Sequence, residues 1–109
     1  MRGVRALALA LLLAAPLAAT AQEAGPTLTI KDHRFEPAEL RVPAGKAVTI
    51  TVRNLDPTAE EFESKALRIE KVIAGNSAGT VRLRPLDKGA YPFVGEYHEE
   101  TARGVIVAE

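Results

Sequence analysis

The sequence predicts an all-β protein, an antiparallel β-sandwich of seven to eight short strands. Two observations predict this fold. Apolar residues alternate with polar residues in short segments along most of the chain, and turn-forming residues separate these segments at short intervals. Alternation with a period of two is typical of a strand with one face in a core and the other in water. Short strands at this spacing, divided by turns, are typical of a sandwich.

The expected strands follow in order from the apolar residues that share a face. They are Leu28 and Ile30, then Val48, Ile50 and Val52, then Val81 and Leu83, then Tyr91 and Phe93, and last Val105 and Val107. Proline, glycine, asparagine and aspartate mark turns at 43–45, 54–57, 74–76 and 85–89. These residue types favour turns because their backbone angles or short side chains suit a reversal of the chain.

One segment fits two patterns. Charged residues occupy nearly every second position between Thr58 and Ile73. We expect short strands at 61–64 and 67–73, and a helical turn within 59–66 is the alternative.

The N-terminal 21 residues have the three parts of a cleavable secretory signal peptide. Arg2 and Arg5 give a positive start, 6–13 is an unbroken run of alanine and leucine, and 19–21 supplies small residues for cleavage. The apolar run is shorter than the roughly 20 residues of a membrane span. We therefore expect export to the periplasm, one domain at 22–109, and no stable membrane insertion after cleavage. An uncleaved anchor is the alternative.

Charge and cysteine content narrow the function of this domain. Removing Arg2 and Arg5 from 14 basic residues leaves 12 against 14 acidic ones, a net charge near −2. That balance argues against a nucleic-acid partner, which requires a basic face. The chain has no cysteine. A domain of this size must therefore be held together without disulfides by its core, with or without a metal ion.

Three stretches resemble the cupredoxin family. They are Phe35–Lys46, the strand Val48–Asn54, and the closing segment Gly89–Val107 with His98 inside it. Their order and spacing cover nearly all of residues 22–109. The resemblance implies a cupredoxin-like Greek-key β-sandwich with a metal site between the loops at one end.

The metal-site pattern departs from that of the blue-copper members, which use two histidines, a cysteine and a methionine. The resemblance places the cysteine position at Gly95 and retains His98, while the histidine of the first ligand loop falls at Glu60 or Glu61. Met1 is the only methionine and belongs to the signal peptide. A blue-copper centre needs the cysteine thiolate. The sequence therefore excludes a blue-copper electron carrier.

A narrower resemblance comes from the segments 61–64, 70–72, 85–86 and 98–104. They are similar to small periplasmic cupredoxin-like proteins of bacterial high-affinity iron permease systems, and to the N-terminal cupredoxin domain of the periplasmic ferrous-iron uptake protein. This resemblance implies that the chain binds iron or copper and assists iron uptake, with Fe(II) oxidation as a proposed role. The implied partners are a membrane iron permease and a periplasmic iron-binding protein.

His98 is the first candidate metal ligand, because it lies in a polar loop between two strands and imidazole suits iron, copper and zinc. Its neighbours Glu96, Glu99 and Glu100 can donate oxygen atoms or orient the ring. His33 precedes Phe35 in a turn that the family fold places at the same end. The alternative for each histidine is an exposed surface residue.

The carboxylate candidates depend on strand register. Glu61 and Glu63 are two residues apart and share one strand face, with Phe62 pointing into the core. A slip of one residue would exchange them for Glu60 on that face, so Glu60 is the alternative ligand. Glu70 is a further oxygen donor. A solvated acidic strand face is the alternative for the whole set.

The donors available are therefore nitrogen and oxygen atoms, which suit iron, Mn, Zn or Cu(II) better than Cu(I). No nucleophile set and no phosphate-binding glycine loop is visible in the sequence. A ferroxidase is one hypothesis for the function, although the sequence shows no self-evident catalytic set. Another is a cupredoxin-fold interaction module without metal, which docks on a membrane permease or redox partner.

Overall fold

Nine β-strands and one short 3₁₀ helix, η1, form the part of the chain that the computed structural model describes, namely residues 3 and 25–109. In order they are β1 (Thr27–Lys31), β2 (Arg34–Glu36), β3 (Glu39–Val42), β4 (Val48–Asn54), β5 (Glu60–Ser64), β6 (Ile69–Ile73), β7 (Ser77–Leu83), β8 (Gly89–Gly95), η1 (Glu96–His98) and β9 (Arg103–Ala108). The expected signal peptide lies, apart from Gly3, outside these residues. No helix among them is long and apolar enough to cross a membrane.

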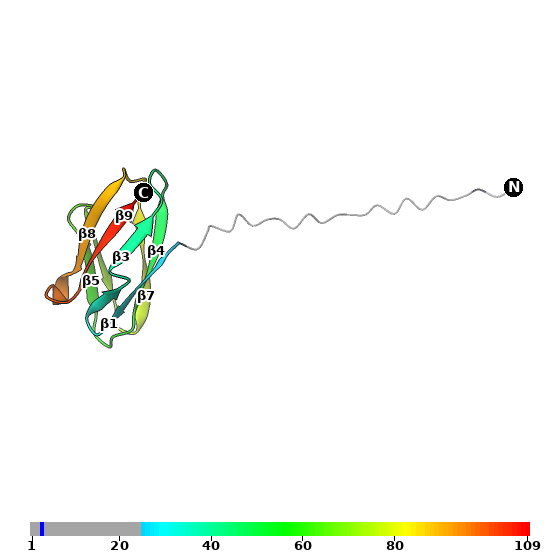
Figure 1. Cartoon of the computed structure of the whole chain (residues 1–109). Coiled ribbons are helices and arrows are strands. Elements are labelled where there is room, and N and C mark those ends of the chain that lie inside the picture. The colour runs from blue at the N-terminus through cyan, green and yellow to red at the C-terminus, as the bar shows by residue number, and fades with distance from the viewer. Residues whose placement is uncertain (1–2, 4–24) are drawn as a thin grey trace.

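The strands form two sheets that pack face to face (Figure 1). One sheet has the order β2-β1-β4-β7, and the other has the order β3-β9-β8-β5-β6. The all-β sandwich predicted from the sequence is confirmed, with nine strands in the described residues where seven to eight were expected. The two sheets are mixed, because β1 pairs with β4 and β3 pairs with β9 in parallel. The chain crosses between the sheets to bring these strands together. The alternation of apolar and polar residues in a single segment does not reveal such crossings.

Three phenylalanines from three strands fill the centre of the core. The rings of Phe35 and Phe62 each lie against Phe93 with centroids 4.9 Å apart. Aromatic pairs at such distances contribute about 0.5–1.5 kcal/mol beyond their buried area. The other buried hydrophobic residues of the core are Leu28, Ile30, Leu40, Val42, Ile50, Val52, Leu67, Ile73, Val81, Leu83, Leu86, Ala102, Ile106 and Ala108.

Strand β9 shows which face of the last strand enters the core. Ile106 and Ala108 are buried, whereas Val105 and Val107 share the opposite face and are only partly buried. The pattern thus located the strand but indicated the wrong face for the core, because the buried residues are Ile106 and Ala108 and not the two valines. The strand expected at 67–73 begins later, at Ile69, because Leu67 lies in the preceding turn.

Candidate metal centre

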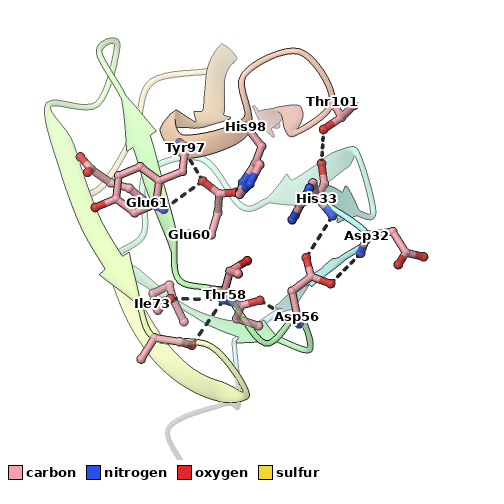
Figure 2. A network of polar contacts seen from close by, with 12 residues as sticks. Asp32, His33, Asp56, Thr58, Glu60, Glu61, Ile73, Tyr97, His98 and Thr101 are labelled. Carbon is pink, nitrogen blue, oxygen red and sulfur yellow. Dashed lines mark hydrogen bonds and ion pairs between the residues drawn. The ribbon is translucent and has the colours of Figure 1, made fainter.

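Residues from three separate segments meet at one end of the sandwich. His33 lies in the turn between β1 and β2, Glu60 is the first residue of β5, and His98 is the last residue of η1. The His33 and His98 rings stack with centroids 3.5 Å apart, and Nδ1 of His98 lies 2.5 Å from Oε2 of Glu60 (Figure 2). We call these three residues the inner centre.

Glu60 is the buried member of the inner centre. Its Oε1 atom accepts hydrogen bonds from the backbone N–H groups of Glu61 and Tyr97, both at 3.0 Å. The side chain is 2% exposed, while that of His98 is 26% exposed. A buried carboxylate is costly unless hydrogen bonds and a cationic partner compensate it. The His98 ring and the two amides supply that compensation and fix the direction of the carboxylate.

Gly95 provides the space that the Glu60 carboxyl group occupies. A Cβ atom at this position would lie 2.7 Å from Cδ of Glu60 and 2.7 Å from Cβ of Ala102. Gly95 also stands at the position where the family resemblance places the blue-copper cysteine. A side chain here and the carboxylate of Glu60 therefore exclude each other.

The turn that carries His33 has an uncommon backbone conformation. Asp32 and His33 both have positive φ, 52° and 56°, in a two-residue connection between the paired residues Lys31 and Arg34. Such turns suit the twist of a hairpin, but they are uncommon for histidine. The Asp56 carboxylate compensates by accepting from the N–H groups of Asp32 at 2.8 Å and of His33 at 3.0 Å.

Two further contacts hold this loop in place. The Thr101 hydroxyl donates to the His33 carbonyl at 2.6 Å, which ties the turn to the loop after η1. The hydrogen bond from the His33 N–H is the main cause that lowers the pKa of Asp56 below its usual 3.8. Asn54 accepts from the Asp56 N–H at 3.0 Å and donates to the carbonyl of Thr58 at 2.8 Å.

The structure thus brings together His33, Glu60 and His98 of the five predicted ligands. Glu61 and Glu63 share one face as expected, with Phe62 buried between them, but that face is the outer face of the sheet. They do not join the inner centre. Glu60 lies on the same strand face as Phe62 and reaches the inner centre from there. The sequence offered Glu60 only as the alternative that a one-residue slip would allow, and no such slip occurs.

A second group of acidic side chains lies on that outer face. Carboxylate oxygens of Glu61, Glu70 and Glu96 all lie within 4.8 Å of one another, and we call these three residues the carboxylate cluster. A hydrogen bond that the Glu96 carboxyl group donates to Glu61 raises the pKa of Glu96, and partial burial and the charge of Glu61 add to the shift. Partial burial and the charge of Glu96 raise the pKa of Glu63 nearby. The raised pKa values show that the negative charges on this face repel one another.

Several supporting residues were not singled out from the sequence. Asp56, Asn54 and Thr101 position the loops of the inner centre without belonging to it. The segment Asn54-Leu55-Asp56 was recognised only as a turn signal. Its asparagine and aspartate are the residue types that bond to nearby backbone, but which backbone they reach depends on the tertiary fold.

The residue types of the inner centre suit a metal ion. Among the described residues, however, the donor atoms that lie within 4.8 Å of one another are those of the carboxylate cluster, so an ion at the inner centre requires the stacked His33 and His98 rings to rearrange. Two imidazoles and one carboxylate form the kind of set that holds non-haem Fe(II) with open coordination positions, and they also suit Cu(II) and Zn. Two donors bound to a tetrahedral ion at about 2.0–2.1 Å lie roughly 3.3 Å apart. Glu60 Oε2 and His98 Nδ1 are closer, at 2.5 Å, so an ion bound by both atoms would separate the two side chains.

Comparison with known proteins relates this chain to one protein family and to one curated relative. A family model described as a cupredoxin-like domain matches residues 3–108. A protein of Rickettsia prowazekii (strain Madrid E), described as uncharacterized, is 39% identical over 80 residues, which are 73% of this chain. The chain spans 64% of the length of that relative.

Solved structures show the same fold at low identity. An oxidized point mutant of amicyanin superposes with a TM-score of 0.64 and 21% identity, covering 78% of this chain and 82% of the other. Auracyanin A, a "blue" copper protein from Chloroflexus aurantiacus, has a TM-score of 0.64 and 17% identity, covering 78% of this chain and all of its own. At these identities the likeness concerns the fold alone.

Proposed function

Because this chain belongs to the family of cupredoxin-like domains, we propose that it is an exported protein that binds one iron or copper ion at His33, Glu60 and His98. The family resemblance places its metal site at this end of the sandwich. The donor set here contains nitrogen and oxygen atoms alone, which distinguishes it from a blue-copper centre.

The observation that carries this proposal is the contact between the buried Glu60 carboxylate and His98, with the His33 ring stacked on that of His98. The three donors come from segments far apart in sequence. The turn that carries His33 is held by its own N–H, which donates to Asp56, and by its carbonyl, which accepts from the Thr101 hydroxyl. Such support is expected where side chains must be held in position for a ligand.

Binding at this centre has a specific pH dependence. Imidazole and carboxylate ligands bind a metal ion in their deprotonated forms, so affinity should rise as pH increases. In weak buffer, proton release accompanying metal binding should therefore be measurable by calorimetry in two buffers of different ionisation enthalpy.

Equilibrium dialysis of residues 22–109 against Fe(II) without oxygen, and separately against Cu(II), tests the assignment. We expect one ion per chain, with affinity reduced about tenfold or more in Glu60→Gln and in His98→Ala, since each removes a donor. Glu36→Gln, at an exposed position of β2, is the matched control and should bind as the parent does. If Glu61→Gln abolishes binding while His98→Ala retains it, the ion occupies the carboxylate cluster and the inner centre is the wrong assignment.

We further propose that the bound ion serves iron uptake by a membrane permease in the periplasm. The support is the resemblance of residues 61–64, 70–72, 85–86 and 98–104 to cupredoxin-like proteins of iron permease systems. Oxidation of Fe(II) would release one electron, which oxygen or a partner protein must accept. Aerobic Fe(II) oxidation no faster than in buffer would remove the ferroxidase role and leave binding and delivery.

One observation favours the metal-free alternative, an interaction module. Every buried polar side-chain atom among the described residues has a hydrogen-bond partner, including those of Glu60, so the inner centre is satisfied without an ion. The dialysis experiment decides between the two functions, because the metal-free module predicts no Fe(II) or Cu(II) binding above that of His98→Ala.

A further inference from the structure

The outer face of the five-stranded sheet presents apolar side chains on its two central long strands. The outward-facing residues of β8 are Ala90 and Pro92, which are exposed, and Val94, which is partly buried; those of β9 are Val105 and Val107, both partly buried. Register places Val105 opposite Pro92 and Val107 opposite Ala90, so the five side chains form one continuous patch. An outer sheet face normally carries polar residues, and an apolar patch of this kind marks a contact surface.

Charged residues border this apolar patch along β3 and at both ends of β9. Glu39 lies opposite Val105 and Arg41 lies opposite Val107. The Arg41 guanidinium pairs with the Glu39 and Glu109 carboxylates at 3.3 and 3.1 Å, and all three side chains are more than half exposed. Arg103 is exposed at the other end of β9. An apolar centre with a charged rim is the usual anatomy of a protein interface.

The charges on this face are complementary to those of a second copy of the same face. Leu40 and Ile106 are paired in register. Consider a two-fold axis that lies between the two facing sheets, perpendicular to the strands, at the level of this pair. Rotation about it places each strand antiparallel over the same strand of the second copy. Arg41 of one copy then lies over Glu39 of the other, and Arg103 lies over Glu109. Val105 likewise lies over Val107. Each charge of the rim thus meets the opposite sign, and the apolar residues meet one another.

We propose that residues 22–109 form a two-fold dimer through the outer faces of their five-stranded sheets, with this register of opposing residues. Sheets pack face to face with strands within about 30° of alignment, which this arrangement allows. The same rotation puts the two carboxylate clusters and the two inner centres at opposite ends of the dimer. The like-charged groups are then far apart, and both inner centres stay open to solvent.

The extent of the face sets the expected strength. With strands about 4.8 Å apart and a rise of about 3.4 Å per residue, four strands and the span 103–109 cover roughly 15 by 20 Å in projection. Side-chain surface exceeds the projected area, so two faces bury roughly 1,000 Å² together, near the lower limit for a specific interface. An interface of this size is typical of weak association, so we expect a dimer that forms at micromolar to millimolar concentration.

Analytical ultracentrifugation of residues 22–109 from about 1 μM to about 0.5 mM tests the proposal at low ionic strength, where charge pairs act most strongly. Arg41→Glu should raise Kd about tenfold or more, because it opposes two carboxylates across the axis, and Glu39→Arg should do the same with two guanidiniums. An equimolar mixture of the two variants should associate about as well as the parent, since opposite charges meet again in the mixed dimer. Mixing restores the dimer only if residue 41 of one copy faces residue 39 of the other, as this register requires.

Control variants distinguish an effect at this sheet face from an effect of the change in net charge alone. Arg82→Glu, at an exposed position of β7 in the other sheet, should change Kd by less than about twofold. Val105→Asp should abolish the dimer, and circular dichroism checks that it still folds. A parent protein that is monomeric at 0.5 mM overturns the proposal. So does an unrestored mixture, or an effect of Arg82→Glu equal to that of Arg41→Glu.

This dimer is independent of the proposed metal function. His98→Ala should leave Kd for dimerisation unchanged while it weakens metal binding. A monomeric protein that binds iron would therefore refute the dimer alone, and a dimer that binds no metal would refute the metal centre alone.

Discussion

Replacing Glu60 by alanine is the sharpest test of how the inner centre is built. Three donors lose their acceptor in this variant, namely the backbone N–H groups of Glu61 and Tyr97 and the ring of His98. Glutamine at the same position keeps one oxygen for the two amides and places its NH₂ group toward His98. The two substitutions therefore differ in the number of donors that they leave unpaired.

The expected magnitudes follow from that difference. A buried donor without an acceptor costs about 1–3 kcal/mol. Some water will reach the vacated space beside His98, which is 26% exposed, and reduce this cost. We expect Glu60→Ala to lower the free energy of unfolding by about 3–5 kcal/mol and Glu60→Gln by about 1 kcal/mol. A domain of this size has roughly 5–10 kcal/mol in total, so the alanine variant should be close to unfolding.

Urea unfolding followed by far-UV circular dichroism measures both values, with tyrosine fluorescence as a second probe of two-state behaviour. Glu36→Ala, which removes an exposed glutamate from β2, should change stability by less than about 0.5 kcal/mol. Equal losses in Glu60→Ala and Glu60→Gln, or a loss below about 1 kcal/mol in the alanine variant, would refute the reasoning that Glu60 is the acceptor that organises these loops.

Three further predictions concern space and charge around the centre. Gly95→Ala should cost about 1–3 kcal/mol in urea unfolding, because its Cβ would lie 2.7 Å from Glu60 Cδ, and a neutral result would show that this carboxyl group moves freely. The pKa of Asp56 is lower in the folded state, so its contribution is complete well above pH 3.8 and is lost as pH falls below that value. Asp56→Asn should therefore destabilise the protein at pH 7 and flatten its acid-unfolding profile, and an unchanged profile would contradict the assignment. The pKa of Glu96 is raised by Glu61, so its charge opposes folding above that pKa. Glu96→Gln should raise the melting temperature at pH 7 but not at pH 3, and equal shifts at both would argue against repulsion.

The sequence by itself determined the strands and the chemistry of the donors. Alternation located the strands that contain Leu28, Ile50, Val81 and Phe93, because a period of two residues records a half-buried strand without any knowledge of its partners. The absence of cysteine from the sequence excluded a thiolate ligand before any fold was considered. Both conclusions depend on residue type and local spacing, which the chain carries explicitly.

The tertiary structure decided which of these residues meet. Glu60, and not Glu61 or Glu63, enters the inner centre because the packing of Phe62 in the core fixes the register of β5, and a side chain on one face of a strand cannot reach the other. His33 reaches His98 because Asp56, 23 residues further along the chain, holds its turn. The apolar face of β8 and β9 likewise emerges only from cross-strand pairing. Contacts between distant segments depend on sheet order and on crossings between sheets, and the local patterns read in a single sequence do not record either.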